Sequence, residues 1–140
     1  MSKFIIVYDA CVLYPAPLRD LLVELARTGL FQARWTEEIH AEWLRNVLAD
    51  RPNTSVEKLA RTKQLMNEAV LDSVVIGYED LIMGLNLPDP DDRHVLAAAI
   101  HCGANIIVTK NLKELIDLLG IRSSQETRQP GMSFGGFRIP

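Results

Sequence analysis

Three carboxylates stand where the surrounding sequence predicts a buried environment. Asp9 directly follows residues 4–8, a run of apolar and aromatic side chains. Asp92 precedes apolar residues of the same predicted helix by three, four and seven positions, so it falls on the helix face that points toward the core. Glu42 lies directly before Trp43, at the edge of a second apolar helix stripe. A carboxylate in such a place is costly unless a cation neutralises it.

Each of these acids also has an ordinary structural interpretation. Asp89 can cap a helix, and Asp91 and Asp92 complement the positive end of that helix. Asp9 can order a loop, and Glu42 can be a solvated surface side chain. Carboxylates from separate elements are, however, the hard oxygen ligands that Mg²⁺ and Mn²⁺ prefer. Because such ions can activate water for phosphodiester hydrolysis, the residues point to a metal-dependent nuclease.

The elements that must position these residues alternate between strands and helices. Residues 4–8 are typical of a strand buried on both faces of a parallel sheet, and residues 105–109 are the clearest late strand. Ligands bind at the carboxyl ends of strands in such sheets, which is where Asp9 and Thr109 fall. The alternation predicts an α/β domain with a mainly parallel sheet wrapped by helices.

Further elements are expected between these strands. Helices are predicted after the turn at residues 15–17, from the cap Thr36, and from Thr54, where Glu57 completes a capping box. The other expected elements are strands at 31–33 and 74–77, a short helix at 78–85, a turn at 87–90, a helix through 97–100 closed by Gly103, and a last helix at 112–119.

The composition agrees with one folded domain. The chain has 140 residues and is 48% hydrophobic, enough for a packed core. We expect a domain over residues 1–122 and an extended or loosely docked tail over residues 123–140, which are polar and rich in Gly and Pro. The chain has two cysteines, and we identify no signal segment and no apolar run of about 20 residues. These features predict a cytoplasmic protein without membrane contact.

The net charge of −3 argues at first against a nucleic-acid partner. Its distribution changes that conclusion. Residues 43–63 contain five basic and two acidic side chains, and residues 105–140 contain five basic and three acidic ones. Part of the acidic excess is the proposed metal cluster, whose charge bound cations would offset. RNA binding is therefore compatible with the charge.

Four segments occur in an order typical of a known family. They are Val7–Leu13 with Asp9, the helical Glu42, the sequence DPDDRHVLAAAI at 89–100, and IVTKNLKEL at 107–115. Over about residues 3–119 the chain resembles PIN-domain proteins, many of which are VapC-like ribonuclease toxins of bacterial toxin–antitoxin pairs. The resemblance implies an α/β PIN-like domain.

The resemblance also implies an acidic Mg²⁺ or Mn²⁺ site that cleaves single-stranded RNA. By position, Asp9, Glu42 and Asp92 would be metal ligands and catalytic residues. The fourth catalytic position, often Asp in the family, is Asn111 here. Secondary candidates are Asp89 and Asp91 as alternates to Asp92, Thr109 as an orienting hydroxyl, and Glu114 as an acid that follows Asn111.

The function implied is a metal-dependent endoribonuclease, with a cognate antitoxin and a homodimer as expected partners. The alternative is a PIN-like module that binds RNA or protein with weakened or lost catalysis, and Asn111 is its support. Other hydrolases fit less well. A phosphatase of the haloacid-dehalogenase type would need an acid where Cys11 stands, and no Gly-rich phosphate loop or Ser–His–Asp arrangement can be identified.

Overall fold

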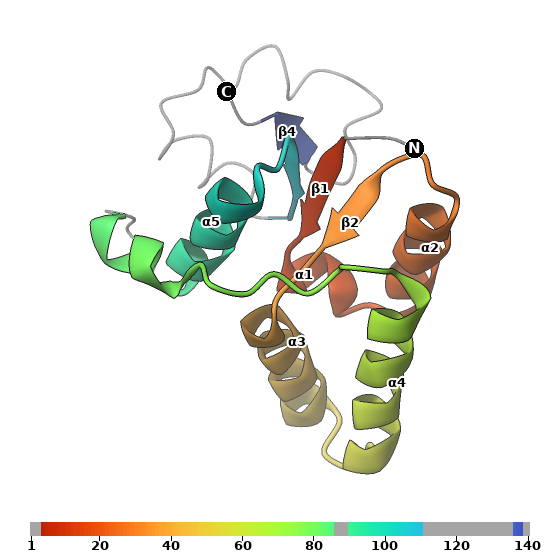
Figure 1. Cartoon of the computed structure of the whole chain (residues 1–140). Coiled ribbons are helices and arrows are strands. Elements are labelled where there is room, and N and C mark those ends of the chain that lie inside the picture. Colours follow the sequence, from red (N-terminus) through yellow and green to blue (C-terminus); the bar gives the residue numbers. More distant parts are fainter. Residues whose placement is uncertain (1–3, 86–89, 111–135, 139–140) are drawn as a thin grey trace.

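A four-stranded sheet forms the centre of the protein, in the order β2-β1-β3-β4 (Figure 1). This computed structural model describes residues 4–85, 90–110 and 136–138. The strands are β1 (Ile5–Tyr8), β2 (Gln32–Arg34), β3 (Ile106–Val108) and β4 (Gly136–Arg138).

The first three strands run parallel, as the sequence predicted. Ile6 of β1 is in register with Ala33 on one side and Ile106 on the other. Val7 and Ile107 are fully buried, which is expected for apolar strands covered on both faces. The α/β fold with a mainly parallel sheet is therefore confirmed.

β4 comes from the polar C-terminal stretch and pairs antiparallel with β3, with Ile107 opposite Phe137. Part of the expected tail thus adds an edge strand to the sheet. The boundary predicted between residues 122 and 123 lies outside the described residues and stays a prediction.

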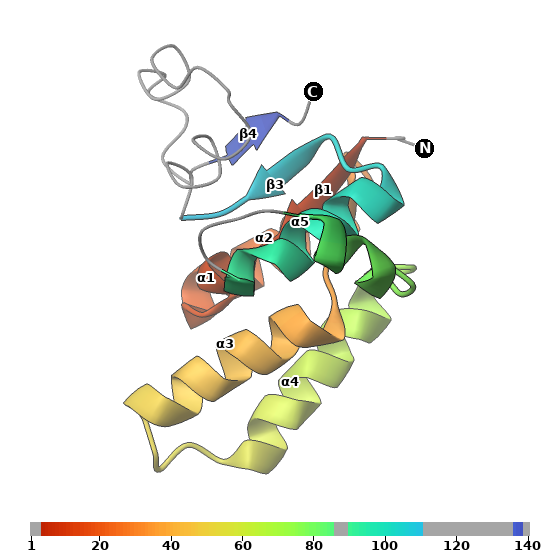
Figure 2. The same ribbon diagram turned by 90° about the vertical axis from the view of Figure 1, so that its left-hand side faces the viewer.

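Helices surround this sheet. They are α1 (Ala10–Leu13), α2 (Ala16–Arg27), α3 (Glu37–Asp50), α4 (Val56–Ala69), the 3₁₀ helix η1 (Glu79–Gly84) and α5 (Pro90–Cys102). The carboxyl ends of the parallel strands point toward α1 and toward the hairpin formed by α3 and α4 (Figures 1 and 2). No helix within the described ranges is long and apolar enough to cross a membrane.

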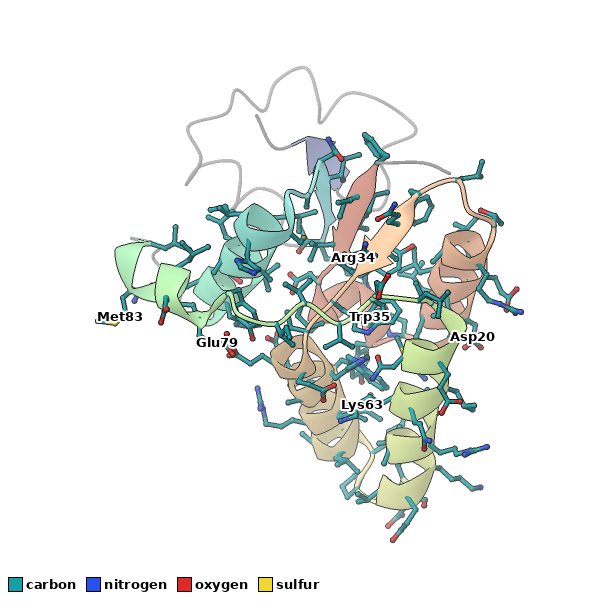
Figure 3. The ribbon with its side chains drawn as sticks, in the orientation of Figure 1. Asp20, Arg34, Trp35, Lys63, Glu79 and Met83 are labelled. Atoms are coloured by element: carbon teal, nitrogen blue, oxygen red, sulfur yellow. The ribbon has the colours of Figure 1, made fainter. Side chains whose placement is uncertain are left out.

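An aromatic core joins the sheet to the α3–α4 hairpin. Trp35, which lies where β2 leads toward α3 (Figure 3), stacks on Tyr8 with ring centroids 6.1 Å apart. Its indole Nε1 donates to Asn67 Oδ1 of α4 at 2.7 Å. His40 Nε2 lies 2.9 Å from the same oxygen, and Trp43 Nε1 donates to His40 Nδ1 at 3.0 Å. The ring nitrogens of Trp35, His40 and Trp43 therefore all have hydrogen-bond partners.

The predicted start of α3 is confirmed, and the predicted start of α4 is wrong. Thr36 Oγ1 accepts from the backbone N–H of Ile39 at 3.0 Å, as a helix cap should. In α4 the cap is Ser55, not Thr54, and Ser55 Oγ accepts from the Lys58 N–H at 3.2 Å. The sequence offers two adjacent hydroxyl residues, and the path of the preceding turn decides between them.

The strand expected at residues 74–77 is also wrong, apart from its first residue. Val74 forms a single parallel bridge with Trp35. Gly77 then adopts a φ of +80°, which ends the extended conformation, and Ile76 is 77% exposed. The short helix expected at 78–85 is present as the 3₁₀ helix η1, whereas α1 was not expected. The turn residues 87–89 and the helix predicted at 112–119 lie outside the described residues.

Candidate active site

Asp9 occupies the junction between β1 and α1. Its backbone N–H donates to the Val108 carbonyl at 3.0 Å, so the residue still belongs to the parallel ladder with β3. Its side chain already caps the next helix, because Oδ1 accepts from the Ala10 N–H at 2.7 Å. The carboxylate is therefore fixed at the carboxyl edge of the sheet, where α/β proteins bind their ligands.

A second contact fixes the other oxygen of Asp9 from the end of β3. Thr109 Oγ1 donates to Asp9 Oδ2 at 2.8 Å. Cys11 Sγ lies 3.3 Å from Thr109 Oγ1 and accepts from the Lys110 N–H at 3.0 Å. Asp9 and Thr109 are separated by 100 residues, so only the adjacency of β1 and β3 brings them together.

Burial raises the pKa of Asp9, whose side chain is almost fully covered. The hydrogen bonds from Thr109 and from the Ala10 N–H act in the opposite direction, because they favour the ionised form. The negative charge of Glu42 raises the pKa further, and His94 lowers it. The net upward shift marks a carboxylate for which a nearby cation would be strongly favourable.

Glu42 and His94 approach this carboxylate from α3 and α5. His94 Nε2 lies 3.4 Å from Glu42 Oε1. Burial alone would lower the pKa of His94, but the hydrogen bond to Glu42 and the charges of Glu38, Glu42 and Asp9 outweigh it, so that pKa is raised. The acids around His94 thus favour its protonated form.

His94 was not among the residues that the sequence singled out. His94 is 7% exposed, and its Nδ1 has no hydrogen-bond partner among the described residues. A signal for its burial exists in the sequence, because His94 precedes Ala97 and Ala98 by three and four positions. Both alanines are fully buried.

Asp92 lies in the first turns of α5, two residues before His94, and only 7% of it is exposed. The inward direction predicted for this carboxylate is therefore confirmed. Its position near the helix N-terminus suits a negatively charged side chain. The start of α5 lies on the same side of the sheet as α1 (Figure 2), and α5 contacts β1.

The structure thus places Asp9, Glu42, His94 and Thr109 around one edge of the sheet, with Asp92 on the helix that carries His94. Among the described residues, no three His, Cys, Asp or Glu side chains are grouped closely enough to hold a metal ion. Asn111, Glu114 and Asp89 lie outside the described residues, as does the side chain of Asp91, and their roles stay predictions.

Comparison with known proteins gives a single assignment. A family profile described as PIN domain matches residues 5–113, which include the three parallel strands β1, β2 and β3 and the helices α1 to α5 of the described part of the chain. Searches among curated proteins and among solved structures found no match.

Proposed function

The chain belongs to the PIN-domain family, which is associated with nuclease activity, and we propose that it is a metal-dependent endoribonuclease that cleaves single-stranded RNA. The observation that carries this proposal is the environment of the Asp9 carboxylate. A buried carboxylate is held by two hydrogen bonds at the carboxyl edge of the sheet, next to a second carboxylate, Glu42. Such an arrangement has a structural cost that a bound cation would remove.

The donors available suit Mg²⁺ or Mn²⁺. Mg²⁺ is bound through one or two carboxylates and keeps several waters, so it does not need three protein ligands at one point. Asp9 and Asp92 are buried carboxylates that would hold it, with Glu42 at the rim, where the side chain is 28% exposed. When bound, the metal supplies a Lewis acid for phosphate oxygens and a water of lowered pKa.

The residues around Asp9 would keep this site in order. Thr109 holds Asp9 Oδ2 and the Ala10 N–H holds Oδ1, so the carboxylate cannot rotate freely. His94 Nε2 contacts Glu42 Oε1 and thereby keeps that side chain directed toward the site. Preorganisation of this kind is what positions a phosphodiester for attack.

The decisive experiment is a cleavage assay on defined single-stranded RNAs with Mg²⁺, with Mn²⁺ and with EDTA. We expect cleavage by the wild type with either metal, and loss of cleavage to the EDTA level in Asp9→Asn, because a metal ligand is removed. Asp20→Asn serves as the control, since Asp20 is an exposed aspartate of α2. Thermal melting would check that both variants fold. Unchanged cleavage by purified Asp9→Asn would refute the assignment.

We further propose that the enzyme acts as a VapC-like toxin in the cytoplasm, as a homodimer restrained by a cognate antitoxin. The support for this finer role is the sequence resemblance of residues 3–119. Expression of the wild type should inhibit growth, whereas expression of Asp9→Asn should not. A neighbouring gene product should relieve the inhibition. Indifference of the cells to the wild type would argue against the toxin role.

The alternative is a module that binds RNA without cleaving it. Asn111 favours it, because an amide replaces the acid common at that family position. RNA binding by the wild type without cleavage in Mg²⁺ or Mn²⁺ would establish this alternative. Calorimetric titration with Mn²⁺ would then show whether metal affinity has been lost as well.

A further inference from the structure

A cavity lies where four helices of the described part of the chain meet. It has a volume of about 360 Å³ and is lined by residues from the end of α1, the start of α2, the end of α3 and the start of α4. Tyr14 and Pro15 border it on one side, and Arg51 and Thr54 border it on the other. Figure 2 shows α1 next to the α3–α4 hairpin, and α1 contacts α3.

The charge of this cavity is entirely positive. Arg19 and Arg51 line it, and none of its lining residues is an aspartate or glutamate. The neighbouring acid Asp50 accepts a hydrogen bond from the Tyr14 hydroxyl at 2.5 Å. Within the described part of the chain, neither arginine forms an ion pair with a carboxylate. Two arginines therefore line one cavity whose lining contains no carboxylate.

Arg19 is held rigidly in place. It is 8% exposed, and its Nη1 donates to the carbonyls of Leu13 at 2.9 Å and Tyr14 at 3.2 Å. Its guanidinium lies 4.4 Å from the centre of a Trp43 ring, a cation–π contact. Its buried Nε has no acceptor among the described residues. Burial lowers the pKa of Arg19, which shows that the cation is kept there at a cost.

We propose that this cavity binds a phosphate group of the RNA backbone, at a subsite separate from the carboxylates. This inference rests on the proposed function. α1 connects the two places, because Asp9 caps its first turn and Tyr14 follows its last residue. The four residues of α1 correspond to a rise of about 6 Å, so both sites can contact one RNA strand. Guanidinium groups bind phosphate oxygens with two parallel hydrogen bonds, which matches the pair of arginines.

The surrounding charge favours RNA over an acidic peptide as the occupant. Two further bases of the α3–α4 hairpin, Arg45 and Lys58, are exposed, and residues 43–63 have five basic against two acidic side chains. This excess of basic side chains in the segment that contributes Arg51 favours a polyanion with regularly spaced charges.

The test is binding of a fluorescently labelled single-stranded RNA of 12 nucleotides, measured by anisotropy in EDTA, where no metal-dependent cleavage occurs. Arg51→Gln should weaken binding about fivefold and lower the salt slope by about 0.7, the value for one phosphate contact to a single strand. Arg61→Gln is the matched control, because Arg61 is exposed on the same hairpin and does not line the cavity. It should change affinity by less than about twofold.

Arg19→Gln should weaken binding further, but it removes buried contacts and can unfold the protein, so Arg51→Gln decides the outcome. Equal affinities of Arg51→Gln and the wild type, or equal losses in Arg51→Gln and Arg61→Gln, would overturn the subsite. Absence of RNA binding by the wild type would overturn it too. Failure of the proposed function is distinguishable: binding would still depend on Arg51, while Mg²⁺ and Mn²⁺ would give no cleavage.

Discussion

At the scale of single residues, the contact between Asp9 and Thr109 matters most. Thr109 is fully buried, and its hydroxyl holds one oxygen of a carboxylate whose other oxygen caps α1. The orientation of Asp9 thus depends on a residue that would not itself need to touch a metal. Partners of this kind usually affect metal affinity and activity almost as strongly as the ligands they orient.

We therefore predict that Thr109→Val lowers RNA cleavage by about tenfold or more, although the valine has nearly the same shape. The reason is the loss of the donor to Asp9 Oδ2. Cleavage rates at fixed Mg²⁺, together with calorimetric Mn²⁺ affinity, would measure the effect. Thr109→Ser is the control, since it keeps the hydroxyl. If both variants lose activity equally, the hydroxyl has no orienting role.

A second prediction at this scale concerns Tyr78, whose hydroxyl donates to Glu38 Oε1 at 2.6 Å. Burial, followed by this hydrogen bond, raises the pKa of Tyr78 from 10.0 to about 12. Between these values an unfolded tyrosine ionises while the folded one keeps its proton. Tyr78 therefore stabilises the fold below pH 10 and loses this contribution as the pH rises toward 12.

Urea unfolding at about pH 9 and pH 11 would measure this effect. The free energy of unfolding should fall more steeply with pH in the wild type than in Tyr78→Phe, which cannot ionise there. The other titrating groups are common to both proteins, so the difference between the two slopes isolates Tyr78. Identical slopes would contradict the prediction.

At the scale of elements, helix starts determine how the α3–α4 hairpin is built. Both helices begin at a hydroxyl side chain that accepts a backbone N–H, Thr36 in α3 and Ser55 in α4. Sequence spacing identified the first and was one residue off for the second. The reason is that Thr54 and Ser55 are adjacent hydroxyl residues that can both cap a helix, and only Ser55 has the extended backbone conformation and the side-chain contact of a cap, although Glu57 completes a capping box with Thr54 in the sequence.

This distinction can be measured. Ser55→Ala should lower the free energy of unfolding by about 1 kcal/mol, because the Lys58 N–H loses its acceptor. Thr54→Ala should change it by less than about 0.5 kcal/mol, since Thr54 is not the cap. Urea denaturation of both variants gives the comparison. The reverse order of the two effects would restore the capping box at Thr54.

At the scale of the whole molecule, the hairpin is tied to the sheet by a small polar network in an aromatic core. Asn67 Oδ1 of α4 accepts from Trp35 Nε1 and lies 2.9 Å from His40 Nε2. Because Trp43 Nε1 donates to His40 Nδ1, the ring proton must be on Nε2, so His40 is neutral. Burial agrees with this state, since it lowers the pKa of His40. The same α3 carries Glu42, so this network also fixes the side of the active site that α3 contributes.

We predict that Asn67→Ala lowers the free energy of unfolding by about 2–3 kcal/mol, because two buried donors lose their acceptor. Asn46→Ala is the control, since Asn46 is exposed on α3. Thermal or urea unfolding of the two variants would show the difference. A loss below about 0.5 kcal/mol in Asn67→Ala would mean that water replaces the amide.

Local patterns in the sequence predicted much of the fold. The apolar run at 4–8, the cap at Thr36 and the alternation of elements predicted the parallel sheet and the α3 helix, because burial and capping act over a few residues. Residues 74–77 show the limit of such patterns. They have strand-like composition, but Gly77 turns the chain away and only Val74 pairs with Trp35.

The sequence by itself determined that Asp9 ends a buried strand and that Asp92 faces the core. Only the tertiary structure decided that Thr109 holds Asp9, that His94 contacts Glu42, and that Arg19 and Arg51 line one cavity. The physical reason is the distance along the sequence over which each kind of interaction acts. Strand and helix signals arise from neighbouring residues, whereas these contacts join elements that meet only once the sheet order and the helix packing are fixed.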